Sequence, residues 1–298
     1  MLKTGIKKEL MFFTRSFKMA GIIIAAVVLA VASPLLMKLS GLAMSSLDPM
    51  DIDNSQNGNY RDVSLQVNIN DEYMSYGSDL DSMLSLFEDE NLAPLGLISA
   101  FGDLTNTLLL IFMIVTMYSA GGELKKRSMI IPRNAGLSTK LYVLPKFLVY
   151  PFAAAVFAFG GVLVSGLVTA IVFNGVYEIN MGSLMQVALT AAVYDAFIVT
   201  LYFTLGLCTA RAGIATIILY GGSAILSVLF TSLGADKFQP FALKTMAQDI
   251  LMEGEADLIN LFGSIGVTVL LMLLCYFVTI FVISAKRTDN RGEEGIEL

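Results

Sequence analysis

Six long apolar runs alternate with polar connections along the 298 residues. Each run has the length, about 20 residues, that an α-helix needs to cross a bilayer. A segment in lipid must satisfy all of its backbone polar groups internally, so apolar runs of this length predict helices. The expected fold class is therefore an all-α membrane protein with six transmembrane helices, at 20–37, 94–120, 147–173, 184–210, 214–233 and 258–285.

The first 19 residues follow a different pattern. Their large apolar side chains recur every three or four positions, which places them on one stripe of a helix, and most of the cations lie around the opposite side. The pattern predicts an amphipathic helix at the cytoplasmic membrane interface, at 1–19, followed by a transmembrane domain at 20–298. A cleavable signal peptide is the alternative, but the apolar run that follows is longer than a signal core. The stripe is formed by Leu2, Ile6, Leu10, Phe13 and Phe17, and the cations are Lys3, Lys7, Lys8, Arg15 and Lys18.

Two polar connections are acidic. The loop 39–93 holds eleven acids and one base, Arg61, and the segment 234–257 also has more acids than bases. Extracellular loops are poor in Lys and Arg, so both connections are expected outside. Alternation at 63–69 suggests a strand or small hairpin. The acids of 39–93 lack the spacing of a calcium-binding loop, and no metal site is expected. In 234–257 a short helix could lie on the outer leaflet or dip into it, with Phe241, Met246, Ile250 and Leu251 along one side.

The connection 121–146 is basic, with six cations and one carboxylate, Glu123. Cations concentrate on the cytoplasmic side of membrane proteins. Most of the 19 Lys and Arg fall in this segment, in 1–19, at Arg211 and after residue 285. The pattern predicts a multi-pass protein of the cell membrane with both termini in the cytoplasm.

The composition agrees with a membrane protein and excludes several kinds of catalytic and metal site. Hydrophobic residues make up 56% of the chain and charged residues 15%, against about 25% charged in a soluble domain. There is no histidine, which excludes His-ligated haem, the two-histidine zinc motif and Ser-His or Cys-His catalysis. The net charge of -6 adds little, because the two signs are separated by compartment. We expect no catalytic site in this chain and no nucleic-acid partner.

Two acids lie within the apolar runs. Asp195 falls near the middle of the predicted fourth span, where an unpaired charge costs about 2.5 to 3.5 kcal/mol on insertion scales. It therefore faces a cavity, has a partner or is protonated, and both a structural role and a role on a substrate or proton pathway stay open. Asp103, in the outer half of the second span, is shallower and more easily hydrated.

The segment 121–146 also has the features of a docking element. The chain resembles the permease subunits of type-2 ABC exporters, which have an interfacial N-terminal helix, six spans and a cytoplasmic loop between spans two and three. In that family the loop begins with an acid, continues through a basic, small-residue stretch, passes a proline and ends in a lysine that opens the third span. The matching residues here are Glu123, Lys126, Arg127, Ser128, Pro132 and Lys146, with Arg127-Ser128 in place of the family's usual Gly-Thr pair.

The resemblance implies that this loop is a coupling element in contact with a separate ATPase, in an assembly of two permeases and two ATPases. Arg127 and Arg133 are then candidate docking cations. ATP and Mg²⁺ would bind the partner, since this chain has no phosphate-binding loop of the Gly-x-x-x-x-Gly-Lys-[Ser/Thr] type. The other partners expected are the lipid bilayer and a second permease copy or homologue. An apolar or amphipathic substrate such as a peptide, lipid or drug suits a pathway with few charges.

Two other functions remain open. An ion-coupled secondary transporter could use Asp195 and Asp103 as a proton or sodium relay, but it predicts an inverted repeat, and the long acidic loop after span one has no counterpart after span four. A membrane sensor or scaffold that binds a ligand on its acidic exterior is the third possibility.

Overall fold

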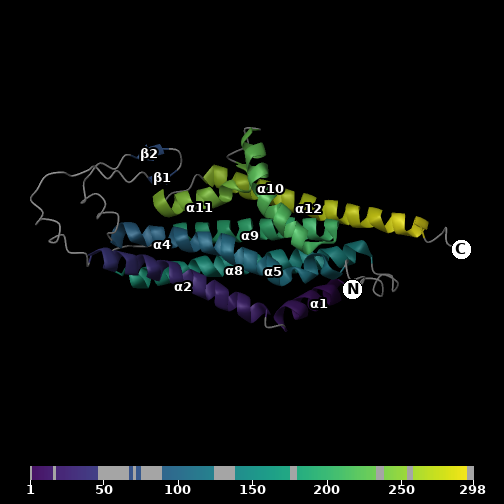
Figure 1. Ribbon diagram of the computed structural model, residues 1–298, viewed down its shortest axis with the longest axis horizontal. Helices are drawn as coiled ribbons and strands as arrows, with labels where there is room; N and C mark the ends of the chain where they lie inside the picture. Colours follow the sequence, from purple (N-terminus) through teal and green to yellow (C-terminus); the bar gives the residue numbers. More distant parts are fainter. Residues whose placement is uncertain are drawn as a thin grey trace, which may run out of the picture.

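The computed structural model shows a bundle of long helices that run side by side along its longest axis (Figure 1). The start of the first helix and the end of the last helix lie toward the same end of this bundle. The residues that the structure describes are 2–15, 18–45, 67–69, 72–74, 89–123, 138–174, 180–232, 238–253 and 258–293.

Five described helical segments are long and apolar enough to cross a membrane. They lie in α2 (Lys18–Ser45), in the run α4 (Asp89–Asp103), η2 (Leu104–Leu108) and α5 (Leu109–Thr116), and in α8 (Thr139–Val172), α9 (Met181–Thr209) and α12 (Leu258–Glu293). They correspond to the predicted spans one, two, three, four and six. The chain is thus a helical multi-pass membrane protein.

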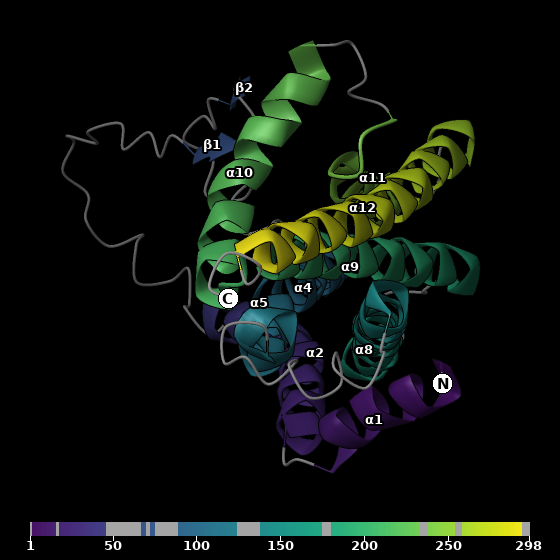
Figure 2. The ribbon, with the colours of Figure 1, turned by 90° about the vertical axis from the view of Figure 1, so that its right-hand side faces the viewer.

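The predicted fifth span corresponds to α10 (Ala212–Ser232), in which the apolar stretch found among the described residues is Ala212–Gly222. Viewed along the bundle, α10 leans away from the other helices (Figure 2). The structure thus supports five spans directly, and the count of six stays a prediction. The tight turn predicted around Arg211 is present: α9 ends at Thr209, Ala210 adopts a left-handed conformation with φ 57°, and α10 begins at Ala212.

The N-terminal segment forms α1 (Leu2–Thr14), which packs across α8 and α2. Its buried face differs from the predicted apolar stripe. Glu9 and Phe13 are buried, whereas Leu10 is 50% exposed. The reason is that α8 offers polar partners to Glu9, and Gly5 lets α1 approach α8 closely: a side chain on Gly5 would come 2.8 Å from Pro145.

Outside the long helices, the structure describes one hairpin and one short helix in the predicted extracellular connections. Strands β1 (Val67–Ile69) and β2 (Glu72–Met74) pair antiparallel, with Asn68 opposite Tyr73, close to the predicted strand at 63–69. Helix α11 (Ala242–Glu253) confirms the short helix predicted in 234–257. Its buried stripe is Leu243, Ala247, Ile250 and Leu251, while Phe241 and Met246 are only partly buried against the core.

Helix α9 is the centre of the bundle and packs against α8, α10, α11 and α12 (Figure 2). Of its most apolar stretch, 67% is buried, against 17% for α12. Its start is fixed by Asn180, whose side-chain oxygen accepts a hydrogen bond of 2.9 Å from the Gly182 amide, as is common for N-cap residues. The buried side chains of α9 and of the helices around it form one large hydrophobic cluster. The outer faces of these surrounding helices are apolar and exposed.

The C-terminal end of the second span, which the distribution of Lys and Arg predicts to be cytoplasmic and which we call its inner end, contacts α9 closely. The span ends in η3 (Tyr118–Gly122), a π-helical turn that bends at Gly121. A Cβ atom on Gly121 would lie 2.6 Å from the Gly206 carbonyl oxygen, and a Cβ atom on Gly206 would overlap the carbonyl oxygen of Ala120. Small residues permit such close backbone contact between membrane helices. This contact fixes the depth and direction at which the second span leaves the bundle.

We predict that Gly206→Ala destabilises the protein, whereas Gly160→Ala does not. Alanine favours a helix over glycine by about 1 kcal/mol, so Gly160→Ala, whose Cβ atom would meet nothing within 4 Å, should leave stability unchanged or raise it. Overpacking against a backbone oxygen typically costs about 1 to 3 kcal/mol. At Gly206 this cost exceeds the gain in helix propensity, so the substitution should lower the stability of the protein. Thermal unfolding of both purified variants in one detergent measures this; equal melting temperatures would contradict the close contact.

Candidate functional site

Lys146 lies in the second turn of α8 and has no solvent exposure. Its Nζ atom donates to Glu9 Oε1 at 2.9 Å and to Ser119 Oγ at 2.8 Å, and forms an ion pair with Glu123 Oε2 at 3.2 Å. These three partners come from α1 and from the inner end of the second span. One ammonium group thus joins three segments that are far apart in the sequence.

Glu9 is the main carboxylate of this group and is only 4% exposed. Besides Lys146, it accepts hydrogen bonds at Oε2 from Ser119 Oγ at 3.1 Å and from Tyr150 OH at 3.0 Å. A buried charge must be paired and hydrogen-bonded to be tolerated, and Glu9 has a partner at each oxygen. Tyr150 is held in turn by stacking on Phe203 of α9, with ring centroids 4.7 Å apart.

Glu123 lies at the edge of the group, where the segment 121–146 begins, and its side chain is 13% exposed. Oε2 accepts a hydrogen bond from Tyr142 OH at 3.3 Å, and Oε1 pairs with Lys8 Nζ at 3.3 Å. Burial raises the pKa of Glu123, but the charges of Lys146 and Lys8 outweigh it and hold the pKa below its ordinary 4.5. The stability that these contacts contribute is therefore fully present above pH 4.5 and is lost as the pH falls through the lowered pKa.

These residues form a closed network that balances two cations against two carboxylates. Its hydroxyl groups serve as linkers, since Ser119 accepts from Lys146 and donates to Glu9. Such buried networks are rigid only when every member is satisfied, and this one satisfies its central charges. We call it the Lys146 cluster, and its members are Lys8, Glu9, Ser119, Glu123, Tyr142, Lys146 and Tyr150.

The structure brings together two of the residues expected in the coupling segment, Glu123 and Lys146. They lie near the two ends of the segment 121–146, of which the structure describes 121–123 and 138–146. The last part of the predicted segment, 139–146, forms the first turns of α8, which Ser138 caps by accepting a hydrogen bond of 3.3 Å from the Leu141 amide. Five predicted residues lie outside the described part of the chain: Lys126, Arg127, Ser128, Pro132 and Arg133.

Sequence reasoning missed most of the cluster. Glu9 was not predicted, because the apolar stripe alone defined the expected interfacial helix, although Glu9 is the only acid in the first 19 residues. A lone acid among five cations was the available signal. Ser119, Tyr142 and Tyr150 carried no such signal, because hydroxyl groups are common in membrane helices. Their partners reach them only when α1, α8 and the end of the second span pack together.

The two acids predicted within the spans are in different environments. Asp103 accepts a hydrogen bond of 2.8 Å from Ser33 of α2. Asp195 is 2% exposed, and its Oδ1 atom has no hydrogen-bond partner in the described part of the chain. No hydrogen bond joins Asp103 to Asp195, so the structure holds no direct relay between them.

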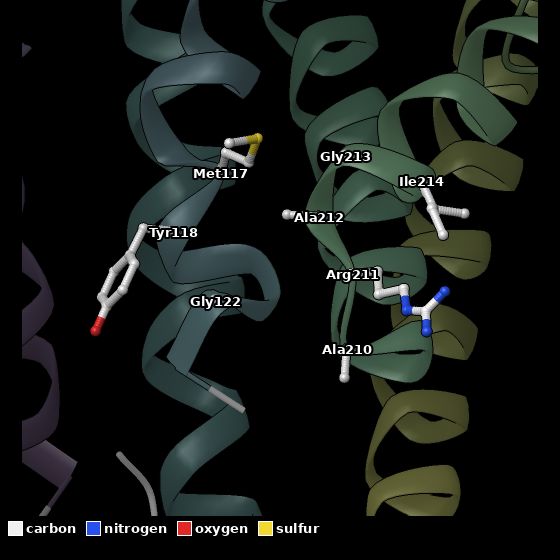
Figure 3. Close-up of a pocket in the computed structure, with 8 residues that line it drawn as sticks. All are labelled: Met117, Tyr118, Gly122, Ala210, Arg211, Ala212, Gly213 and Ile214. Carbon is white, nitrogen blue, oxygen red and sulfur yellow. The ribbon is translucent and has the colours of Figure 1, made fainter. Parts of the chain in front are cut away.

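A pocket of about 520 Å³ opens between η3 and the turn that joins α9 to α10. Figure 3 shows Met117 directed toward this turn, while Tyr118 and Arg211 point in opposite directions. The pocket lies beside Gly122, one residue before Glu123, so the end of the second span is in contact with the Lys146 cluster on one side and with a recess on the other. Its lining is Met117, Tyr118, Gly122, Ala210, Arg211, Ala212, Gly213 and Ile214.

Within the described ranges, no group of three or more acidic or cysteine side chains could hold a metal ion. Comparison with protein-family models, with curated proteins and with solved structures finds no match. The class of the molecule therefore follows from its own structure. It is a multi-pass helical membrane protein in which buried charges attach the N-terminal helix to the second and third spans.

We predict that Lys146→Met destabilises the fold by about 3 to 5 kcal/mol, the usual effect of removing one partner of a buried ion pair. Glu9 would then be buried without a cation. Lys140→Met is the matched control: this exposed lysine lies on the same helix, and its replacement should change stability by no more than about 0.5 kcal/mol. Denaturant unfolding in detergent measures both. Equal stability of the two variants would show that the cluster contributes little.

Proposed function

We propose that the chain is the membrane-spanning permease subunit of an ATP-driven exporter and that a separate ATPase docks on the segment 121–146. The observation that carries this proposal is the Lys146 cluster. It ties both sides of a short basic segment to each other and to α1. A partner that moves this segment would move the second span, the third span and α1 together.

The Lys146 cluster mechanically links the helices on both sides of this segment. The Glu123–Lys146 ion pair of 3.2 Å links the inner ends of two spans that the intervening segment also links covalently. Displacing one end alone would separate buried opposite charges, which is strongly unfavourable. A conformational change imposed by nucleotide on the partner would therefore select between whole arrangements of these spans. ATP and Mg²⁺ would bind the partner, and a second copy or homologue of this chain would complete the pathway.

The segment also has the charge to dock on an acidic surface. Lys125, Lys126, Arg127 and Arg133 all fall between Glu123 and Ser138. Charge complementarity of this kind steers association and sets the register of an interface. The orientation required is the one that the distribution of Lys and Arg predicts, with the segment and both termini in the cytoplasm.

An ion-coupled secondary transporter is the second candidate, and the observation that favours it is the buried Asp195 with an unpartnered oxygen. Acids of this kind often mark ion and proton pathways in transporters. This candidate requires no ATPase. Transport by the purified chain alone under an ion gradient would support it and would refute the exporter.

We predict that the affinity-purified chain retains an ATPase and that the double substitution Arg127→Glu with Arg133→Glu uncouples ATP hydrolysis from transport. Reversal of two docking charges should lower transport at least about tenfold, the effect of roughly 1.4 kcal/mol, without impairing membrane insertion. Hydrolysis and uptake of a lipophilic dye into inverted vesicles measure the two activities side by side.

The charge-conserving pair Arg127→Lys with Arg133→Lys serves as the control and should keep most of the coupling. Normal coupling in the Glu variant would show that the cations of this segment only set the orientation of the chain in the membrane. Failure to recover any ATPase with the wild-type chain would remove the main partner that the proposal requires.

A further inference from the structure

The pocket of about 520 Å³ between η3 and the α9–α10 turn has walls from two parts of the chain. Met117, Tyr118 and Gly122 come from the inner end of the second span, and the other lining residues lie in the turn and in the first turn of α10. The distribution of Lys and Arg predicts that this end of the bundle is cytoplasmic. The pocket is therefore expected at the level of the headgroups of the inner leaflet.

The charge at this pocket is positive. Among the described residues that line it, Arg211 alone is charged. The turn fixes the backbone of Arg211, because Ala210 adopts φ 57° and the Thr209 hydroxyl accepts a hydrogen bond of 3.3 Å from the Arg211 amide. No carboxylate in the described ranges forms an ion pair with Arg211, and Glu123, the acid next to the pocket in the sequence, is already paired within the Lys146 cluster. The pocket thus has a guanidinium that can accept an anionic partner.

Most of the remaining lining is apolar, and it continues along the outer surface of both helices. On the second span, Met117 is exposed, and so is Ile114, which lies three residues earlier on the same helical face. On α10, Ile214 is exposed together with Ile218, one turn further along. Figure 3 shows the side chain of Ile214 beside that of Arg211. Two apolar stripes therefore lead from the pocket along the surfaces of the predicted second and fifth spans.

A ligand that suits both features has a negative charge next to long apolar chains. A soluble phosphate compound would pair with Arg211 but would leave the apolar walls uncovered, and a lipid without net charge would leave the guanidinium without a counter-ion. The planar guanidinium group matches the geometry of phosphate oxygens and can bind two of them at once. Basic pockets between membrane helices on the cytoplasmic side are typical sites for anionic headgroups.

We propose that this pocket binds a phospholipid of the inner leaflet whose headgroup has a net negative charge. Arg211 binds the phosphate, and the acyl chains follow the stripes formed by Ile114 with Met117 and by Ile214 with Ile218. Such a lipid lies between the second span and α10, the helix that leans away from the bundle (Figure 2). The site depends on the cytoplasmic orientation of this end of the chain and requires no ATPase.

Native mass spectrometry of the full-length chain, delipidated in a nonionic detergent, tests this site. Dioleoyl phosphatidylglycerol, which is anionic, and dioleoyl phosphatidylcholine, which has no net charge, are titrated separately. The first molecule of phosphatidylglycerol should bind about fivefold more tightly or better, because one Arg near an anionic lipid contributes an affinity of about this size. Glycerol phosphate, the charged group without acyl chains, should not displace it.

Two variants test the charge and the recess separately. Arg211→Gln should lower the affinity for phosphatidylglycerol about fivefold or more and remove the preference. Lys140→Gln is its matched control, because it removes an exposed cation that does not line the pocket, and it should keep the preference. In Gly213→Leu the added Cβ atom would meet nothing within 4 Å, and leucine favours a helix, so this variant should fold. Its side chain would take up part of the recess and should weaken binding of phosphatidylglycerol.

Equal affinity of the wild-type chain for the two lipids would overturn the proposal, and so would a preference that survives in Arg211→Gln. Displacement by glycerol phosphate would make the pocket a site for a soluble phosphate compound instead. An equal loss in Lys140→Gln would show general attraction to the basic end of the bundle. If Arg211→Gln does not fold, unchanged binding in Gly213→Leu would still contradict the site. None of these results bears on whether an ATPase docks on the segment 121–146.

Discussion

The burial of Lys146 is the constraint on which the rest of the inner half depends. An ammonium group without solvent exposure must be surrounded by acceptors, whereas the hydroxyl groups of Tyr142 and Tyr150 on α8 donate to Glu123 and Glu9. The two carboxylates have to come from elsewhere, and they come from α1 and from the end of the second span. The position of α1 across α8 is thus determined by charge pairing, with Phe13 adding apolar contact to Tyr150 and Phe112.

The second span contacts the Lys146 cluster and also packs against the rest of the bundle. Its inner end is held by the Lys146 cluster on one side and by the glycine contact with α9 on the other. Its π-helical turn η2 is held by Lys244 of α11 through Asn106. π-Helical turns occur mostly as local insertions and often at functional sites. The second span therefore connects the Lys146 cluster to helix α11.

Much of the fold could be predicted from the sequence, because apolar runs long enough to cross a bilayer leave few alternatives to helices. Five of the predicted spans are present, and the tight turn at Arg211 and the short helix α11 were also foreseen. Glu123 and Lys146 were predicted as the two ends of one loop, but the ion pair of Lys146 with Glu9 could not be predicted. That pairing depends on how α1 rotates, and a helix with Gly5, Glu9 and Phe13 on its buried face looks polar on that face in the sequence. The unpartnered oxygen of Asp195 likewise depends on which neighbours the packing brings near it.

The central claim is that Lys146 and Glu9 act as one unit that fastens α1 to the third span. A double-mutant cycle with Glu9→Gln and Lys146→Met, read as unfolding free energy in detergent, measures it directly. Glu123 keeps Lys8 as a partner in every member of the cycle. The account predicts that the double variant loses less stability than the sum of the single variants, with an interaction of about 1 to 3 kcal/mol. Additive losses, within about 0.5 kcal/mol, would contradict it.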